Sequence, residues 1–536
     1  MRSRSPSLPP RRDFLRQLGL GAAALGGAGL ASGLAGGPLQ QLWQGAPGLF
    51  LPRQAHAFGV AGPEYVSSLI PVQRRAKNVL EIFLYGGVSQ FESFYAVREH
   101  GKSDFTHSWL YQQTGDLQNA ANQCGIPAGD NELFGEFATD SEGQVVSLGP
   151  FVAPLRARPD LLQRLRVMVT SHDLEPHEAA IPQMLGGRGL GNPALAGLGA
   201  HIQRYFQEQE GIAGRAPYSY VLLQQSLSAF PTDNLRAATA IGQHPGSARP
   251  LSLTVDGAGE LAELLMRGTV GSSRKAWDDL VQSHISRYRQ RLQRPEVSVP
   301  VRTPRWTDLQ AAAAAVSGTG AVEAMLPGEF FAKQGIDRCG DKWEVDPVAM
   351  NLRLAAHLLT HPQTPARYVC VLDGGLLPAD GGGGYDTHEE SPFTQTRNLG
   401  NTLAALTSLI NTPGEADPDK LNLDDTLIVL TTEFGRTPFK QGQKGRNHWP
   451  YGFPVVMLGG PVRADNAGVY GACGEDGRAI SGCTPQENRI AALSALGIWP
   501  FANESFNVAD VTGAANEAQA AQLVGNRVLG LAEMAP

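Results

Sequence analysis

The chain has 536 residues, of which 42% are hydrophobic, and carries a formal net charge of −7 at pH 7. This length and composition allow a large buried core. The acidic balance argues against nucleic acid and anionic membrane surfaces as partners.

The first 57 residues have the pattern of an export signal. Arg11-Arg12 precedes an apolar stretch rich in glycine and alanine at residues 18–38, and Ala55-His56-Ala57 offers a cleavage site. A membrane anchor is the alternative, but so much glycine and alanine makes a weak span. We therefore expect export through the twin-arginine translocase and a mature chain that begins near Phe58. The product would be periplasmic or extracellular, without a stable membrane span. Removing six Arg and one Asp with the leader lowers the formal net charge to −12.

Five cysteines allow several pairings in an oxidising compartment. Cys473 and Cys483 lie close enough in sequence to close a short surface loop, and Cys124 can reach Cys339. Cys370 lies within an apolar run, which is typical of a buried free thiol.

Seven apolar runs have the pattern of buried strands and alternate with segments of helical periodicity. This alternation predicts βα units. We expect an α/β fold with a doubly wound, mostly parallel sheet and helices on both faces. The predicted strands span Asn78–Tyr85, Arg166–Thr170, Tyr218–Leu223, Leu251–Val255, Arg367–Leu372, Thr426–Thr431 and Pro454–Leu458. The predicted helices span Leu261–Met266, Ala276–Leu292, Asp346–Leu359, Thr394–Ile410 and Asn488–Leu496.

Two regions interrupt the alternation. Residues 99–160 are polar and glycine-rich, and we expect an excursion over the sheet edge or a lid. Residues 295–345 combine prolines with an alanine run and predict a partly helical insertion. Without a clear internal repeat or a long linker, we interpret residues 58–536 as one domain with these two insertions, although length alone allows two or three domains.

Polar side chains collect after the first two predicted strands. Ligands bind beyond the carboxyl ends of parallel strands in open α/β sheets. Gly86-Gly87 allow a sharp turn and close approach of a ligand, and Ser89 and Glu92 follow, although Glu92 could equally be solvated in a turn. The segment 171–178 holds two histidines, including His177, and three acids, a dense supply of metal-binding or acid–base groups. A solvated charged loop is the alternative there.

Further acids and histidines follow the fifth and sixth predicted strands. Asp386 and His388 are two residues apart, so an extended segment would direct both to the same side, as a metal clamp requires. Glu433 and Arg436 follow the sixth strand, either in a site or as an ion pair that caps a core strand. His448 follows a short basic loop, where it could bind a metal or simply pack beside a tryptophan. This mixture of donors suits zinc, manganese or iron.

In this order, the motifs resemble those of the bacterial domain-of-unknown-function 1501 (DUF1501) family. The likeness covers essentially the whole mature chain. It rests on the twin-arginine leader, Gly86-Gly87-x-Ser89-Gln90-x-Glu92-x-Phe94, His177, Tyr385-Asp386-Thr387-His388, Thr432-Glu433-Phe434-Gly435-Arg436-Thr437, Asn447-His448 and Gly468-Val469-Tyr470-Gly471.

That family is grouped with the alkaline phosphatase and sulfatase superfamily, so the resemblance implies an alkaline phosphatase-like core. It also implies metal ligands at the strand ends and chemistry on phosphate or sulfate esters. The chain departs from the superfamily in three ways. Gly86-Gly87 stand where hydrolases carry an acid, no Cys-x-Pro-x-Arg motif of a sulfatase occurs, and Phe434 cannot bind a second metal.

The first function hypothesis is an exported metal-dependent hydrolase acting on an anionic small molecule or glycan, such as a phosphate or sulfate ester. A divalent metal would act as a Lewis acid. Its proposed ligands are Asp386, His388, Glu433 and His448. The proposed catalytic residues are His177 as ligand or acid–base group, Arg436 as a bidentate anion clamp and Ser89 as a candidate nucleophile.

Two other functions remain open from the sequence. One is a non-catalytic exported protein that keeps the fold and binds a glycan, an anion or an envelope partner. The other is a redox metalloprotein, because the twin-arginine route carries folded cargo that often contains a metal.

Overall fold

The computed structural model describes most of the chain after residue 69. The described residues are 70–100, 115–126, 133–189, 346–362, 365–376, 384–501 and 506–531, with short stretches between 197 and 343. The expected leader, residues 1–57, lies outside them, as do the expected helix Leu261–Met266 and most of the expected insertion at 295–345. All described residues belong to one compact unit, residues 55–536.

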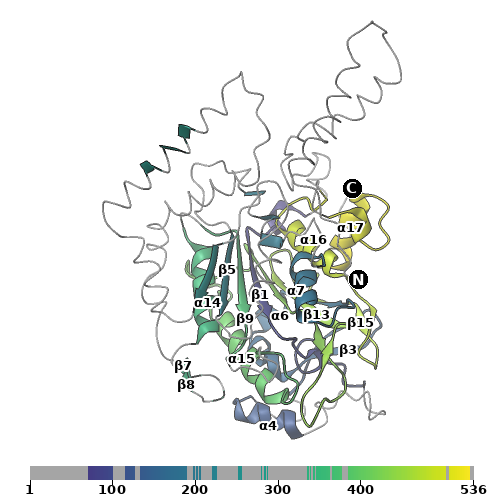
Figure 1. Ribbon diagram of the computed structural model, residues 1–536. Coiled ribbons are helices and arrows are strands. Elements are labelled where there is room, and N and C mark those ends of the chain that lie inside the picture. Colours follow the sequence, from purple (N-terminus) through teal and green to yellow (C-terminus); the bar gives the residue numbers. More distant parts are fainter. Residues whose placement is uncertain are drawn as a thin grey trace, which may run out of the picture. The chain divides into compact units, whose positions relative to one another are not determined.

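An eight-stranded sheet forms the centre of the fold (Figure 1). Its strand order is β14-β4-β13-β10-β1-β9-β5-β6, and every neighbouring pair is parallel except the two that include β13. This confirms a mixed α/β fold with a mostly parallel sheet. The strands are β1 (Asn78–Leu84), β4 (Leu165–Thr170), β5 (Tyr220–Gln225), β6 (Leu251–Val255), β9 (Tyr368–Asp373), β10 (Thr426–Thr431), β13 (Phe453–Gly459) and β14 (Gly468–Tyr470).

All seven predicted strands are present, but the sequence did not reveal the direction of the seventh, β13. Phe453 at its start pairs with Thr170 at the end of β4, and Val456 pairs with Leu430 near the end of β10. The start of β13 therefore lies at the edge where the parallel strands end. As a result, the segment just before β13, which carries His448, reaches that edge as well.

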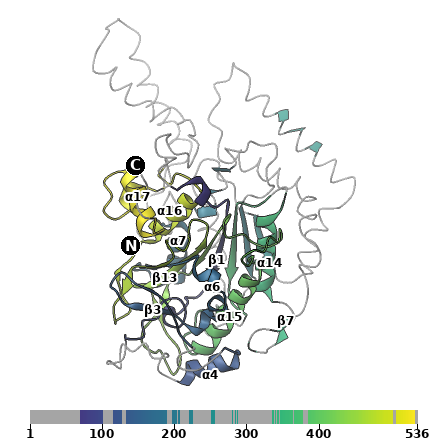
Figure 2. The same ribbon diagram turned by 180° about the vertical axis from the view of Figure 1, so that it is seen from behind.

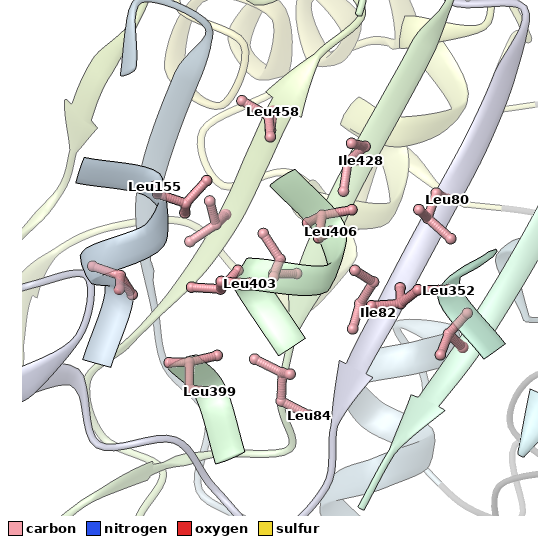
Figure 3. Close-up of a cluster of buried hydrophobic side chains, with 14 of the residues drawn as sticks. Leu80, Ile82, Leu84, Leu155, Leu352, Leu399, Leu403, Leu406, Ile428 and Leu458 are labelled. Atoms are coloured by element: carbon pink, nitrogen blue, oxygen red, sulfur yellow. The ribbon is translucent and has the colours of Figure 1, made fainter. Parts of the chain in front are cut away.

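Helices cover both faces of the sheet and create two hydrophobic cores. Leu80, Ile82 and Leu84 of β1 face the core that includes α14 and α15, as Figure 3 shows, and Val79 and Phe83 face the core that includes α7, α16 and α17. These two helix groups also lie on opposite sides of the ribbon in Figures 1 and 2. Each buried leucine or isoleucine stabilises the fold by about 1.5–3 kcal/mol. The helices are α4 (Gly115–Gln123), α5 (Ala153–Arg156), α6 (Pro159–Leu162), α7 (His177–Gly186), α14 (Pro347–Thr360), α15 (Pro392–Ser408), α16 (Pro485–Ala495) and α17 (Glu517–Arg527).

The remaining described elements are short. The hairpin of β2 and β3 lies beside the edge strand β14, where Ser141 and Gly471 exchange hydrogen bonds of 3.3 and 2.9 Å. The helices α4 and α5 of the same insertion pack on α15. Thus the described part of residues 99–160 includes a hairpin at the sheet edge. The short elements are η1 (Val72–Arg74), η2 (Gln90–Glu92), β2 (Gly135–Thr139), β3 (Val145–Leu148), η4 (Pro150–Val152), β7 (Gly335–Ile336), β8 (Lys342–Trp343), β11 (Gly435–Arg436), β12 (His448–Trp449), β15 (Ala472–Cys473), β16 (Ala479–Ser481) and η7 (Val508–Asp510).

The cysteines follow the expected pattern only in part. Cys124 at the end of α4 forms a disulfide with Cys339, and Cys370 is buried and free, as expected. The expected pairing of Cys473 with Cys483 is wrong, because both are free and buried. Cys473 lies within the β15–β16 hairpin, whereas the Cys483 sulfur lies 3.4 Å from the Val169 carbonyl oxygen of β4.

None of the helices in the described segments is long and apolar enough to cross a membrane.

Candidate metal centre

Polar side chains from four separate loops meet at the carboxyl edge of the sheet. His177 begins α7 after β4, Asp386 follows β9, Glu433 follows β10, and His448 lies in β12 before β13. The central strand β1 lies between β9 and β10, so the site occupies the position where α/β sheets bind ligands.

Asp386 is the centre of this cluster. Its Oδ1 lies 2.9 Å from His388 Nε2 and 3.1 Å from His448 Nε2, and its Oδ2 lies 3.4 Å from His177 Nε2. The structure therefore brings together three of the four predicted metal ligands and His177, which we expected as a ligand or acid–base group.

The three histidines direct the same ring nitrogen toward Asp386 because an oxygen holds the other one. His177 Nδ1 lies 2.7 Å from Glu433 Oε1, His388 Nδ1 lies 2.9 Å from Gln441 Oε1, and His448 Nδ1 lies 3.1 Å from the Glu175 carbonyl oxygen. Since each Nδ1 faces an acceptor, the hydrogen-bond network assigns it the ring proton. When a metal ion is bound, the neutral rings would present their Nε2 lone pairs to it, as metal ligands must.

The nitrogens of two histidines face each other across a short gap. His388 Nε2 lies 3.2 Å from His448 Nε2. Two lone pairs repel each other at this distance, so a proton or a cation must lie between or beside them. A ring proton on one histidine or a metal ion beside them meets this requirement.

Electrostatics keep the central carboxylate ionised. Burial raises the pKa of Asp386, but hydrogen bonds from His177, His388 and His448 and the charge of Arg436 lower the pKa far below its usual range. Burial also lowers the pKa of His177, yet its bonds to Asp386 and Glu433 outweigh burial and raise the pKa to about 9. Asp386 and Glu433 thus attract positive charge to the His177 ring, and a bound cation would supply that charge instead.

The residues present fit a divalent transition metal. His177, Asp386 and His448 each offer one ligand atom, and these atoms all lie within 4.8 Å of one another. Two imidazoles and one carboxylate suit zinc, manganese or iron. His388 supplies a further nitrogen beside them, and its side chain is the most exposed of the four at 25%.

Glu433 contacts His177 in this arrangement. Its Oε1 accepts the Gly86 backbone N–H at 2.8 Å and lies 2.7 Å from His177 Nδ1, while Thr432 Oγ1 donates to its Oε2 at 3.2 Å. A carboxylate that holds the outer nitrogen of a ligand histidine fixes its tautomer and orientation. Direct metal binding by Glu433 stays a prediction.

Arg436 is fully buried, and its guanidinium points into the protein. Nη2 donates to Asp386 Oδ1 at 2.5 Å and to the Tyr385 carbonyl oxygen at 3.0 Å, and it also bonds the carbonyl of Gly86. Nε and Nη1 donate to the carbonyls of Gly87 and Arg446 at 3.0 Å each. These bonds lock three loops to one another. The expected role of Arg436 as an anion clamp stays a prediction.

Ser89 belongs to a neighbouring buried network. Its hydroxyl donates to Glu92 Oε2, and Glu92 Oε1 lies 2.5 Å from Arg446 Nη2. All three residues are completely buried, so Glu92 is a structural ion-pair partner and not a solvated turn residue. The expected role of Ser89 as a nucleophile stays a prediction.

Aromatic rings and a backbone oxygen complete the site, and no sequence pattern indicated them. Phe434 stacks on His448 at a centroid distance of 4.2 Å, and Tyr85 stacks on His177 at 5.2 Å. Phe434, which has no metal-binding atom, therefore helps to orient the His448 ring. The Glu175 carbonyl that holds His448 could not be foreseen, because any residue type can supply it.

The sequence model of the family described as "Protein of unknown function (DUF1501)" matches residues 76–490. The chain belongs to the DUF1501 family. The matched region of this DUF1501 protein contains all eight strands of the sheet and the whole histidine–aspartate cluster. No curated protein matches the chain.

Proposed function

We propose that this DUF1501 protein is an exported metal-dependent hydrolase that acts on a phosphate or sulfate ester or a related anionic substrate. The observation that carries the proposal is the convergence of three imidazole Nε2 atoms on the Asp386 carboxylate, each ring held through Nδ1 by an oxygen. Such a set suits a metal ion, and a metal ion on this edge of an α/β sheet suits hydrolysis.

Each residue has a distinct part in this proposal. His177, Asp386 and His448 would hold a zinc, manganese or iron ion, which supplies Lewis acidity and lowers the pKa of a bound water toward ~7. Arg436 keeps Asp386 ionised and in place, and Glu433 fixes the His177 ring. His388 is the most solvent-exposed of the three histidines around Asp386, so it is the best placed to exchange a proton with a substrate or to act as a fourth ligand.

Two observations support the remaining parts of the proposal. The proposed metal ligands lie beyond strand ends of a mostly parallel sheet, as in the alkaline phosphatase and sulfatase superfamily that the sequence resembles. The disulfide between Cys124 and Cys339 suits an oxidising compartment and thus export through the Arg11-Arg12 leader.

A non-catalytic binding protein with a structural metal is the second candidate. It is favoured by the orientation of two expected catalytic groups, since the Arg436 guanidinium and the Ser89 hydroxyl are both buried and bonded to protein oxygens. If His388 also bound the metal, four protein ligands would close the site, as is typical of structural zinc.

Metal analysis and an ester screen test the proposal. The purified protein should contain about one equivalent of metal and hydrolyse a phosphate monoester, a phosphate diester or a sulfate ester. Asp386→Ala should abolish both properties, whereas Asp425→Ala, at an exposed ion pair with Lys77, should retain them. Bound metal without turnover would favour the structural candidate. The absence of both metal and turnover would exclude the hydrolase.

A further inference from the structure

Gln395 in α15 is a completely buried amide that joins the loop after β1 to the loop after β9. Its Oε1 accepts the backbone N–H of Ser89 at 2.7 Å. Its Nε2 lies 3.1 Å from the Gly87 carbonyl oxygen, 3.0 Å from the Tyr385 carbonyl oxygen and 2.9 Å from Thr387 Oγ1. One side chain thus connects the two loops through four hydrogen bonds.

Two of these partners flank Asp386 directly. Tyr385 and Thr387 are its neighbours in the chain. The Gln395 amide therefore bonds the backbone of Tyr385 before Asp386 and the side chain of Thr387 after it. Asp386 lies outside any strand or helix. Its position therefore depends on such local bonds more than a residue in a strand would.

Arg436 and Gln395 hold the same short segment. Arg436 Nη2 bonds the Tyr385 carbonyl and the Asp386 carboxylate, whereas Gln395 Nε2 bonds the Tyr385 carbonyl and the Thr387 hydroxyl. Arg436 touches the ligand carboxylate itself. Gln395 touches only the residues around it, so its contribution is to position the carboxylate.

We propose that Gln395 is a positioning residue that fixes the Asp386 carboxylate for metal binding. This inference rests on the proposed metal site. Loss of a residue that holds a metal ligand in place typically lowers metal affinity 10- to 100-fold. Gln395 bonds the residues before and after a proposed ligand and also a second loop. In the described site, no other single buried amide does this.

The test compares Gln395→Met with a neighbouring control in the same helix. Methionine has a similar volume and removes all four hydrogen bonds. The control is Thr396→Val, because Thr396 is equally buried but its hydroxyl bonds only to the Pro392 carbonyl of its own helix. Zn²⁺ affinity is measured by competition with a chelator. Backbone hydrogen exchange at residues 385–388 is measured in the metal-free protein.

We expect Gln395→Met to lower the Zn²⁺ affinity 10- to 100-fold and to accelerate exchange at residues 385–388. Thr396→Val should leave both measurements at wild-type values. If Gln395→Met kept the wild-type Zn²⁺ affinity and the wild-type exchange rates at residues 385–388, the positioning role would be overturned, even if thermal stability were reduced. If the wild-type protein bound none of Zn²⁺, Mn²⁺ and Fe²⁺, the proposed function would fail, and the exchange rates alone would decide whether Gln395 positions this loop.

Discussion

The Nδ1 atom of His177 lies 2.7 Å from Oε1 of Glu433, which also accepts the backbone N–H of Gly86 at 2.8 Å. One buried carboxylate oxygen therefore joins the loops after β1, β4 and β10. In the proposed metal site, this contact would make Glu433 a residue that orients the ligand His177 and does not bind the metal itself.

Glu433→Gln should weaken metal binding without abolishing it. The glutamine oxygen can still accept from both His177 and Gly86, but it has lost the negative charge, so we expect a 10- to 100-fold loss of Zn²⁺ affinity. X-ray absorption should report the same number of nitrogen and oxygen ligands as in the wild-type protein. A loss of binding as complete as that of Asp386→Ala would instead make Glu433 a direct ligand. Glu415→Gln, at an exposed turn, is the control.

Gly86→Ala should displace the metal site itself. Gly86 has φ of 109°, and an added Cβ would lie 2.2 Å from the Asp386 backbone nitrogen. Gly143 is the matched control, since it has φ of 82° and open space around the position of a Cβ. Both alanine variants should lose about 1–2 kcal/mol of stability through the left-handed backbone. Metal titration should show lost binding in Gly86→Ala alone, and equal binding in both variants would contradict this prediction.

The sequence predicted the strands and the polar loops well because both depend on local patterns. Apolar runs defined β1, β10 and the other predicted strands, and parallel strands place the residues that follow them at one edge. His388 Nε2 also reaches the carboxylate of Asp386, two residues before it, and metal binding by this pair stays a prediction.

The rest depends on tertiary contacts that leave no local pattern. The direction of β13 decides whether His448 reaches the site, yet an apolar run reads the same in either direction. Arg436 resembles an anion clamp in sequence, but burial directs its guanidinium to backbone carbonyls. Gln395 is one of several polar residues on α15, and only the fold shows which of them meets the loop beside Asp386.

The disulfide gives a prediction that can be checked by counting thiols. Cys124 and Cys339 are paired across a sequence separation of 215, and the other three cysteines are free. Denatured but unreduced protein should therefore contain three reactive thiols, and reduced protein should contain five. Replacing both paired cysteines by serine should lower the free energy of unfolding by about 2–5 kcal/mol. A single reactive thiol before reduction would indicate that Cys473 and Cys483 pair after all.

Asp373 should make stability depend on pH in a direction opposite to that of most carboxylates. It is completely buried at the end of β9, where burial raises its pKa to about 6, partly offset by hydrogen bonds from Thr402, Tyr385 and the Gly375 backbone. Asp346 adds a smaller repulsion that acts in the same direction as burial. Because the folded protein holds this proton more tightly than the unfolded chain, the resulting stabilisation is complete below pH ~4 and is lost as the pH rises through about 6.

Asp373→Asn cannot titrate, so the difference between this variant and the wild type isolates the effect. A shift of about two pKa units corresponds to about 3 kcal/mol. From pH ~4 to pH ~7, the free energy of unfolding of the wild type should therefore fall by about 3 kcal/mol relative to that of Asp373→Asn. Denaturant titrations of both proteins across this range measure the difference. A constant difference would mean that Asp373 stays ionised at every pH tested, with its three hydrogen bonds outweighing the cost of burial.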